Sequence, residues 1–189
     1  LVVLGGPDSA NDTTPKMTAE LKQVRAAIDA GIPYLGICLG LQVLVKAVGG
    51  RVVPGDGVEA GFVNPGGMQY AVEPTDTGKH DRLLEGMEGS LPVFQLHGEV
   101  VELTEDMQLL AAGAPGCKNQ IVKVAATAYG IQSHFELTDH MLQVWAAEDP
   151  DLTPLGYDKL QKDFASIKAA YFDVGETFFH NFLRIAGLL

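Results

Sequence analysis

The chain has 189 residues, of which 47% are hydrophobic and 20% charged, a composition typical of a globular protein with a sizeable core. Its 13 Lys and Arg residues against 24 Asp and Glu residues give a net charge of −11, which disfavours nucleic acid and membrane surfaces as partners. No apolar run reaches the roughly 18 residues of a membrane span. Two cysteines, Cys38 and Cys117, cannot build a disulfide framework, so we expect a reducing, cytoplasmic location.

The N-terminal part of the chain alternates predicted strands and helices. Apolar residues 1–4 predict a buried strand that ends in the turn Gly5-Gly6-Pro7, and apolar residues at helical spacing follow over 17–30. A second short strand is predicted over 33–37 and a second helix over 39–48. Strands and helices that alternate with short connections indicate a parallel sheet covered by helices.

The middle of the chain is predicted to be rich in strands. Short apolar runs alternate with turns containing Gly or Pro, at residues 51–53, 68–72, 93–96, 108–112, 121–126 and 129–132. A short helix is expected near 81–87, and the helical pattern returns over 138–147 and 157–185. No linker or repeat separates these parts. We therefore expect one domain over 1–189, an α/β fold with an open, mostly parallel sheet, flanking helices and a few antiparallel hairpins.

The most informative segment is Gly36-Ile37-Cys38-Leu39-Gly40-Leu41-Gln42, which joins the second strand to the second helix. It has the form G-x-C-x-G, the thiol version of a nucleophile elbow, in which a strained turn exposes the nucleophile and glycines remove obstructing side chains. Cys38 would lie at the positive end of the helix, which favours its thiolate. The N–H of Leu39 would face the same point and bind a developing oxyanion. The alternative is a buried structural cysteine between two packing glycines.

A nucleophilic cysteine needs a base, and His134 is the leading candidate among five histidines. It follows the apolar run 129–132 at the end of a predicted strand, and Glu136 lies two positions on, on the same face of an extended chain. Gly5-Gly6, Cys38 and His134 thus follow three separate strands. The carboxyl ends of such strands are where open α/β sheets bind ligands.

Ordered motifs along the chain resemble the class I glutamine amidotransferases. Residues 36–42 match the family pattern G-x-C-x-G-x-Q, and Gly130-Ile131-Gln132-Ser133-His134-Phe135-Glu136 is similar to G-x-Q-F-H-P-E. Gly5-Gly6-Pro7 looks like the family's oxyanion segment, and Phe94-Gln95-Leu96-His97-Gly98-Glu99 looks like the H-G-D/E segment of the GMP synthase-type branch. The resemblance covers most of the chain. It implies a flavodoxin-like α/β fold in a stand-alone relative of the GMP synthase amidotransferase domain.

The resemblance implies hydrolysis of the glutamine side-chain amide to glutamate and ammonia through a cysteine thioester. Cys38 would attack the amide carbon, and the N–H groups of Gly6 and Leu39 would form the oxyanion hole. His134, oriented by Glu136, would protonate the leaving ammonia and then activate water.

Gly5, Gln42 and His97 are expected to contact the substrate. Gln42 would help to seat it, as the last residue of the nucleophile motif. His97 directly follows the predicted strand 93–96, and the alternative for it is a histidine in a surface turn.

Two departures from the family patterns affect these expectations. Ser133 and Phe135 replace the usual Phe and Pro beside the histidine, and Phe135 leaves the backbone before Glu136 less restricted than proline would. The strand, helix and strand with which the family normally begins are not found before Gly5. We therefore expect either a truncated fragment or a smaller sheet.

Three other functions remain open. A γ-glutamyl peptidase or hydrolase would use the same three residues on a different leaving group. A thiol hydrolase of the α/β-hydrolase type is disfavoured, because there the acid lies between nucleophile and histidine in the chain, whereas Glu136 follows His134. A non-catalytic regulatory relic would explain both the altered residues around His134 and the missing opening elements.

Neither a cofactor nor a metal is expected. The His and Cys residues have no spacing that suits zinc, and the sequence contains no P-loop. Gly55, Gly57 and Gly61 come within one position of a dinucleotide-binding pattern and are interpreted as a loop. If the ammonia serves a synthesis, the ATP-using synthetase must therefore be a separate subunit.

Overall fold

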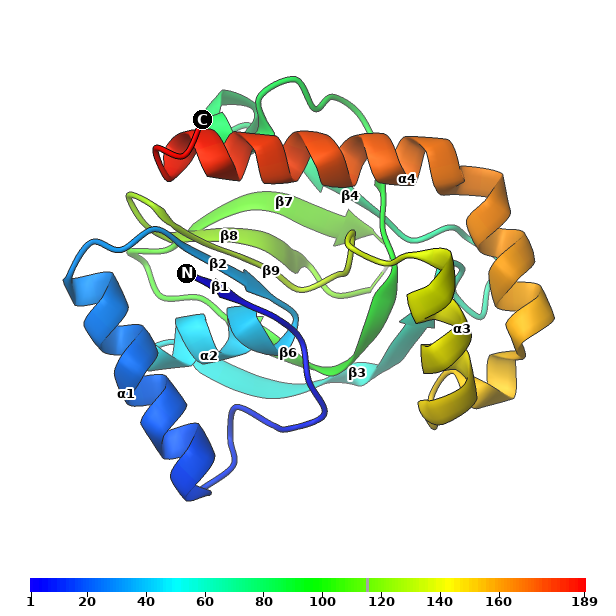
Figure 1. Cartoon of the computed structure of the whole chain (residues 1–189), viewed down its shortest axis with the longest axis horizontal. Helices are drawn as coiled ribbons and strands as arrows, with labels where there is room; N and C mark the ends of the chain where they lie inside the picture. The colour runs from blue at the N-terminus through cyan, green and yellow to red at the C-terminus, as the bar shows by residue number, and fades with distance from the viewer. Residues whose placement is uncertain (115) are drawn as a thin grey trace.

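The computed structural model describes residues 1–114 and 116–189 (Figure 1). A seven-stranded sheet, in the order β1-β2-β9-β8-β7-β4-β5, forms its centre. The strands of this sheet, in chain order, are β1 Val2–Val3, β2 Tyr34–Ile37, β4 Ala71–Pro74, β5 Leu91–Pro92, β7 Gln108–Ala114, β8 Asn119–Ala125 and β9 Ala128–Ile131. Two longer strands, β3 (Arg51–Gly61) and β6 (Gln95–Glu102), pair antiparallel in a separate sheet.

Helices connect the strands and follow the last of them. Their bounds are α1 Pro15–Asp29, α2 Leu39–Ala47, η1 Gly78–His80, η2 Arg82–Leu84, α3 Asp139–Glu148, η3 Thr153–Leu155 and α4 Tyr157–Ile185. The helix predicted over 157–185 is confirmed at both ends. Within the described ranges, none of the helices is both long and apolar enough to cross a bilayer.

The central sheet is parallel on one side and antiparallel on the other. β1, β2 and β9 run parallel, and the register of Gly36 opposite Gly130 places the ends of β2 and β9 side by side. From β9 onward, through β8, β7, β4 and β5, every neighbouring pair is antiparallel. The predicted α/β class is confirmed, and the predicted hairpins extend the same sheet.

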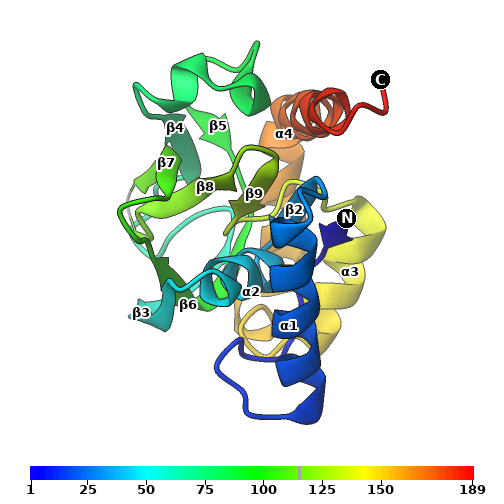
Figure 2. The same ribbon diagram turned by 90° about the vertical axis from the view of Figure 1, so that its left-hand side faces the viewer.

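Helices cover both faces of the sheet, in three layers (Figure 2). Successive residues of β2 point to opposite faces, as in any strand. Tyr34 joins the cluster that includes Leu44 of α2, whereas Leu35 joins the cluster that includes Phe178 of α4. Both β2 and β9 are buried throughout, which is typical of parallel strands covered on two sides.

The segment from Gly55 to Gly61, predicted to be a loop, lies within β3, so that prediction was wrong. The pairing of β3 with β6 shifts register between Pro54 and Glu59, and this irregularity accommodates the glycines inside a continuous strand. An isolated bridge between Phe94, just before β6, and His134, just after β9, joins the two sheets. The start of β6 is thereby held where the parallel strands end.

Candidate active site

Cys38 occupies a strained turn between β2 and α2. Its φ of 53° and ψ of −107° are unusual for a residue with a side chain, and no other non-glycine residue of the described ranges has a positive φ. A Cβ on Gly36 would lie 2.3 Å from Gly40 O, and one on Gly40 would lie 2.1 Å from Val3 O. The two glycines of G-x-C-x-G therefore allow α2 to pack directly against β1 and β2.

His134 and Glu136 form a hydrogen-bonded pair in the segment after β9. His134 Nδ1 lies 2.7 Å from Glu136 Oε1, and the N–H of Phe135 donates to Glu136 Oε2 at 3.0 Å. The N–H of His134 donates to Phe94 O at 2.8 Å, and the N–H of Phe94 donates to His134 O at 3.0 Å. Both the carboxylate and the main chain of the histidine are therefore fixed.

The surroundings of His134 favour its protonated form. Burial lowers the pKa of His134, but interactions with Cys38 and Glu136 outweigh burial and raise this pKa from 6.5 to about 10. Burial likewise raises the pKa of Glu136, yet the hydrogen bond from His134 and backbone donors bring it below its ordinary value. At neutral pH the pair is an imidazolium beside a carboxylate.

The side chains of Cys38 and His134 both lie next to the backbone of Gly5. A Cβ on Gly5 would lie 3.0 Å from His134 Cε1 and 3.4 Å from Cys38 Cβ. Cys38 Sγ lies 3.7 Å from Leu96 O and accepts from the side-chain amide of Gln132 at 3.9 Å. The structure therefore brings the predicted nucleophile and the predicted base into one cleft.

The predicted oxyanion residues line the same cleft. Gly5 and Gly6 border it next to Cys38, and a Cβ on Gly6 would lie 3.3 Å from Leu39 Cδ2. Leu39 is the first residue of α2, where backbone N–H groups have no acceptor within the helix. The helix end thus supplies free donors and partial positive charge beside the thiol, as an oxyanion requires.

Gln42 and His97 also line the cleft, but their side chains bind protein groups. Gln42 Nε2 donates to Glu99 O at 3.2 Å, which ties α2 to β6. The His97 side chain is 2% exposed, and its Nε2 lies 3.1 Å from Gln95 Oε1 and 3.4 Å from Glu59 Oε2. His97 is therefore not a surface turn histidine, and substrate contact by either residue stays a prediction.

The cleft has a volume of about 710 Å³. Part of its wall comes from α3 and the turn after it, namely Met141, Trp145, Glu148, Asp149, Pro150 and Asp151. The Trp145 ring stands nearly perpendicular to the His134 ring, with 5.2 Å between their centroids. An aromatic side chain of α3 thus packs against the imidazole of the candidate base.

The mouth of the cleft is acidic. Besides Glu136, the carboxylates that line the cleft belong to Asp8, Glu99, Glu148, Asp149 and Asp151, and no Lys or Arg is among the described residues of the lining. The C-terminal end of α3 adds partial negative charge beside Glu148. The potential there favours neutral or positively charged ligands over anions. No group of three or more His, Cys, Asp or Glu in the described part of the chain is arranged to hold a metal ion.

Sequence reasoning missed Gln132 and Trp145 as residues of the site. Gln132 is the fixed Gln of the G-x-Q motif, two positions before His134, so its spacing was a usable signal. Trp145 is the only tryptophan of the chain, but the apolar pattern over 138–147 does not tell which element the helix meets. The contact between Trp145 and His134 joins distant elements and therefore has no spacing signal in the sequence.

Comparison with known proteins gives the family. The sequence model of the family Glutamine amidotransferase class-I matches residues 1–142. The glutamine amidotransferase-like protein YfeJ of Salmonella typhimurium is 32% identical over 143 residues, covering 73% of this chain and 56% of YfeJ. The glutamine-hydrolysing GMP synthase of Marinobacter nauticus is 31% identical over 144 residues, covering 76% of this chain and 26% of that enzyme. The chain thus spans about half of YfeJ and a quarter of the GMP synthase.

Solved structures share the fold. A glutamine amidotransferase from Thermotoga maritima, 21% identical, aligns with a TM-score of 0.79 over 98% of this chain and 77% of its own. A glutamine amido transferase from Methylobacillus flagellatus, 25% identical, aligns with a TM-score of 0.72 over 94% and 74% of the two chains. The family match includes the turn at Cys38 and the segment at His134, and the fold is shared along nearly the whole chain. This protein therefore belongs to the class I glutamine amidotransferases.

Proposed function

We propose that this protein hydrolyses the side-chain amide of glutamine to glutamate and ammonia, with Cys38 as nucleophile. One observation carries the proposal: Cys38, in its strained turn, meets His134 in a single cleft, where Glu136 binds the imidazole at 2.7 Å. This is the geometry of a nucleophile, a base and an orienting carboxylate. Membership of the family supports the general reaction class.

In the first half of the reaction, the Cys38 thiolate attacks the amide carbon. A C–S bond forms as the π bond of the carbonyl breaks and its electron pair moves to the oxygen. The N–H groups of Gly6 and Leu39 bind the resulting oxyanion. Because the pKa of His134 is raised to about 10, the imidazole carries a proton at neutral pH. This proton passes to the amide nitrogen as the C–N bond breaks, ammonia leaves and a γ-glutamyl thioester remains.

In the second half, water replaces the sulfur. His134, now neutral, takes a proton from water as its oxygen attacks the thioester carbonyl, and the same N–H groups hold the second oxyanion. Breaking the C–S bond releases glutamate and restores the thiolate beside the imidazolium. Glu136 keeps a proton on Nδ1 throughout, so that Nε2 is the nitrogen that exchanges protons.

We also propose that the ammonia passes to a separate ATP-using synthetase. Relatives of this chain include glutamine-hydrolysing GMP synthases, of which it matches about a quarter. Glutamine hydrolysis measured with and without a candidate synthetase, in the presence of ATP, tests the coupling. A synthetase that leaves the rate and the fate of the ammonia unchanged is not the partner.

The test of the proposed activity compares ammonia and glutamate release by the wild-type protein and by Cys38→Ala. We expect turnover by the wild type and none by the variant. A glutamine-like chloroketone should label Cys38, as located by mass spectrometry. A folded wild-type protein that neither turns over glutamine nor takes the label, with a synthetase partner present, would contradict the proposal and favour a regulatory role.

A second candidate is hydrolysis of larger γ-glutamyl amides by the same three residues. It is favoured by the cleft, which extends past Trp145 to Asp149 and Asp151 and offers more room than ammonia needs as a leaving group. Comparing kcat/KM for glutamine with that for N-alkyl γ-glutamyl amides separates the two candidates. A preference for the alkyl amides would assign the protein to this second activity.

A further inference from the structure

The segment His134–Leu137, which carries the catalytic pair, has no regular secondary structure of its own. It leaves β9 through Gln132 and ends before α3 begins at Asp139. Its backbone pairs with the chain before β6 only at His134, through the bridge to Phe94. Beyond that bridge, the position of the segment depends on whatever else contacts it.

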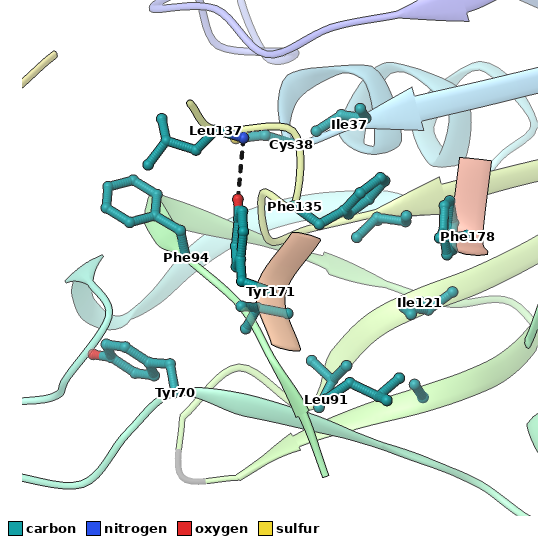
Figure 3. Close-up of a cluster of buried hydrophobic side chains, with 14 of the residues drawn as sticks. Ile37, Cys38, Tyr70, Leu91, Phe94, Ile121, Phe135, Leu137, Tyr171 and Phe178 are labelled. Carbon is teal, nitrogen blue, oxygen red and sulfur yellow. Dashed lines mark hydrogen bonds between the residues drawn. The ribbon is translucent and has the colours of Figure 1, made fainter. Parts of the chain in front are cut away.

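Three residues on one face of α4 hold this segment: Tyr171, Gly175 and Phe178. The N–H of Leu137 donates to Tyr171 Oη at 3.1 Å, and Tyr171 is fully buried (Figure 3). A Cβ on Gly175 would lie 2.6 Å from Phe135 O, so glycine lets the helix backbone approach the segment. The rings of Phe135 and Phe178 lie 4.5 Å apart between centroids. Spacings of four and three residues put the three on one helix face.

These contacts act next to the carboxylate that orients the histidine. Phe135 N–H donates to Glu136 Oε2, which leaves Oε1 for His134. A proline at position 135 would supply neither this donor nor the ring that packs on α4. Position 135 thus binds the carboxylate through its N–H, and its ring packs on α4. The family match ends at residue 142, so α4 lies outside it.

We infer that α4 positions the catalytic pair: through Tyr171 and Gly175 it holds the segment His134–Leu137 in the geometry in which the pair is hydrogen-bonded. The inference deepens the proposed function and rests on it for the roles of His134 and Glu136. Tyr171 is a positioning residue, because it acts on the pair through Leu137. Without its hydroxyl, the buried N–H of Leu137 has no acceptor and the segment must shift to find one.

The experiment compares Tyr171→Phe with Asn181→Ala, a matched variant on the same helix. Asn181 is also buried and donates to Leu83 O at 3.0 Å and Glu85 O at 2.8 Å, away from the cleft. We expect Tyr171→Phe to lower kcat about tenfold at nearly constant KM, because misplaced groups slow chemistry more than binding. The pKa of His134, followed by NMR, should fall toward 6.5 as Glu136 loosens.

Asn181→Ala should lower the melting temperature while the kcat stays within about twofold of wild type and the pKa of His134 is unchanged. If both variants change activity only with their folded fraction and neither moves the His134 pKa, α4 is merely structural and the inference fails. The NMR readout needs no turnover. If the wild type is inactive but Tyr171→Phe still lowers the pKa of His134, the proposed function is overturned, whereas the positioning of His134 and Glu136 by α4 is not.

Gly175→Ala gives a second test that does not depend on the stability of Tyr171→Phe. Alanine is the better helix former, so the substitution favours α4 itself. Its methyl group would nevertheless displace Phe135 O, which it would approach to 2.6 Å. We expect kcat and the His134 pKa to fall although the helix is intact by circular dichroism. Wild-type values for both would overturn the inference.

Discussion

The two halves of the candidate active site are held in different ways. The turn at Cys38 is built mostly by its own neighbours, since β2 and α2 are contiguous in the chain and Gly36 packs against Gly40, with one remote contact from Gly40 to Val3 of β1. The segment at His134 is held by remote elements: Phe94 before β6, Trp145 on α3 and the face of α4 around Tyr171. A short motif therefore fixes the proposed nucleophile, whereas the position of the proposed base depends on packing between distant parts of the chain.

The largest effect is expected from breaking the local half with Gly36→Ala. The added Cβ would lie 2.3 Å from Gly40 O and 2.7 Å from Leu41 N, both backbone atoms that cannot rotate away. We expect the free energy of unfolding to fall by about 1–3 kcal/mol, as for other overpacked sites, and kcat/KM to fall about 100-fold as the thiol moves. Urea unfolding and glutamine hydrolysis measure the two effects.

Gly55→Ala is the control for that substitution. A Cβ on Gly55 would meet a side-chain methyl of Val100 at 3.3 Å and Gly98 O at 3.4 Å, neither of them a severe clash, and Gly55 itself does not line the cleft. It should leave activity unchanged. Equal losses in the two variants would show that the close approach at Gly36 has no special role.

Glu136→Gln breaks the remote half with little change in size. The amide cannot hold an imidazolium as a carboxylate does, so we expect kcat to fall about 10- to 100-fold, in line with other orienting partners, with a smaller change in KM. Steady-state kinetics with Glu148→Gln as control, at the cleft mouth, separate this effect from loss of negative charge. A wild-type kcat in Glu136→Gln would exclude an orienting role.

The same variant should change how stability depends on pH. The raised pKa of His134 stabilises the fold fully below pH 6.5, and this contribution is lost as pH rises toward about 10. The lowered pKa of Glu136 stabilises the fold above pH 4.5, and this contribution is lost as pH falls. The free energy of unfolding of the wild type should therefore exceed that of Glu136→Gln by most between pH 4.5 and 6.5, as measured by urea unfolding across pH. A constant difference would refute the charged pair.

The smallest effect is expected from the charge of the leaving group, because the acidic cleft mouth is exposed to solvent. At low salt, γ-glutamyl amides of a diamine should react about 3- to 10-fold faster in kcat/KM than those of an amino acid, and added salt should reduce the ratio. Glu148→Gln should lower the ratio, whereas Glu88→Gln, outside the cleft, should not. No dependence on charge would limit the role of α3 to covering His134.

The local half of the site could be predicted from sequence because its constraints are local. G-x-C-x-G specifies a strand, a tight turn and a helix within seven residues, and the structure shows the close approach inside this segment that requires Gly36. The elements over 1–48 were predicted for the same reason, since each is marked by its own period and by the turn that ends it. The burial predicted for the first strand was wrong, because β1 lies at the edge of the sheet and Val2 is 42% exposed.

The remote half could be predicted only as candidates. His134 and Glu136 stood out by spacing, but their surroundings come from elements whose packing has no local signature. The pattern over 157–185 gave the extent of α4 and not the fact that Tyr171 would meet Leu137. The loop predicted from Gly55 to Gly61 was wrong for a related reason, because cross-strand pairing of β3 with β6 overrides the preference of glycine for loops.

The backbone angles of Cys38 have a consequence for protein engineering. A residue held at φ 53° and ψ −107° costs on the order of 1–3 kcal/mol, and glycine would adopt these angles without that cost. A search for heat-resistant variants that monitors folding alone would therefore be drawn to Cys38→Gly and would select proteins without the proposed nucleophile. Thermal stability and proposed activity impose opposite demands at this position, so the two properties must be screened together.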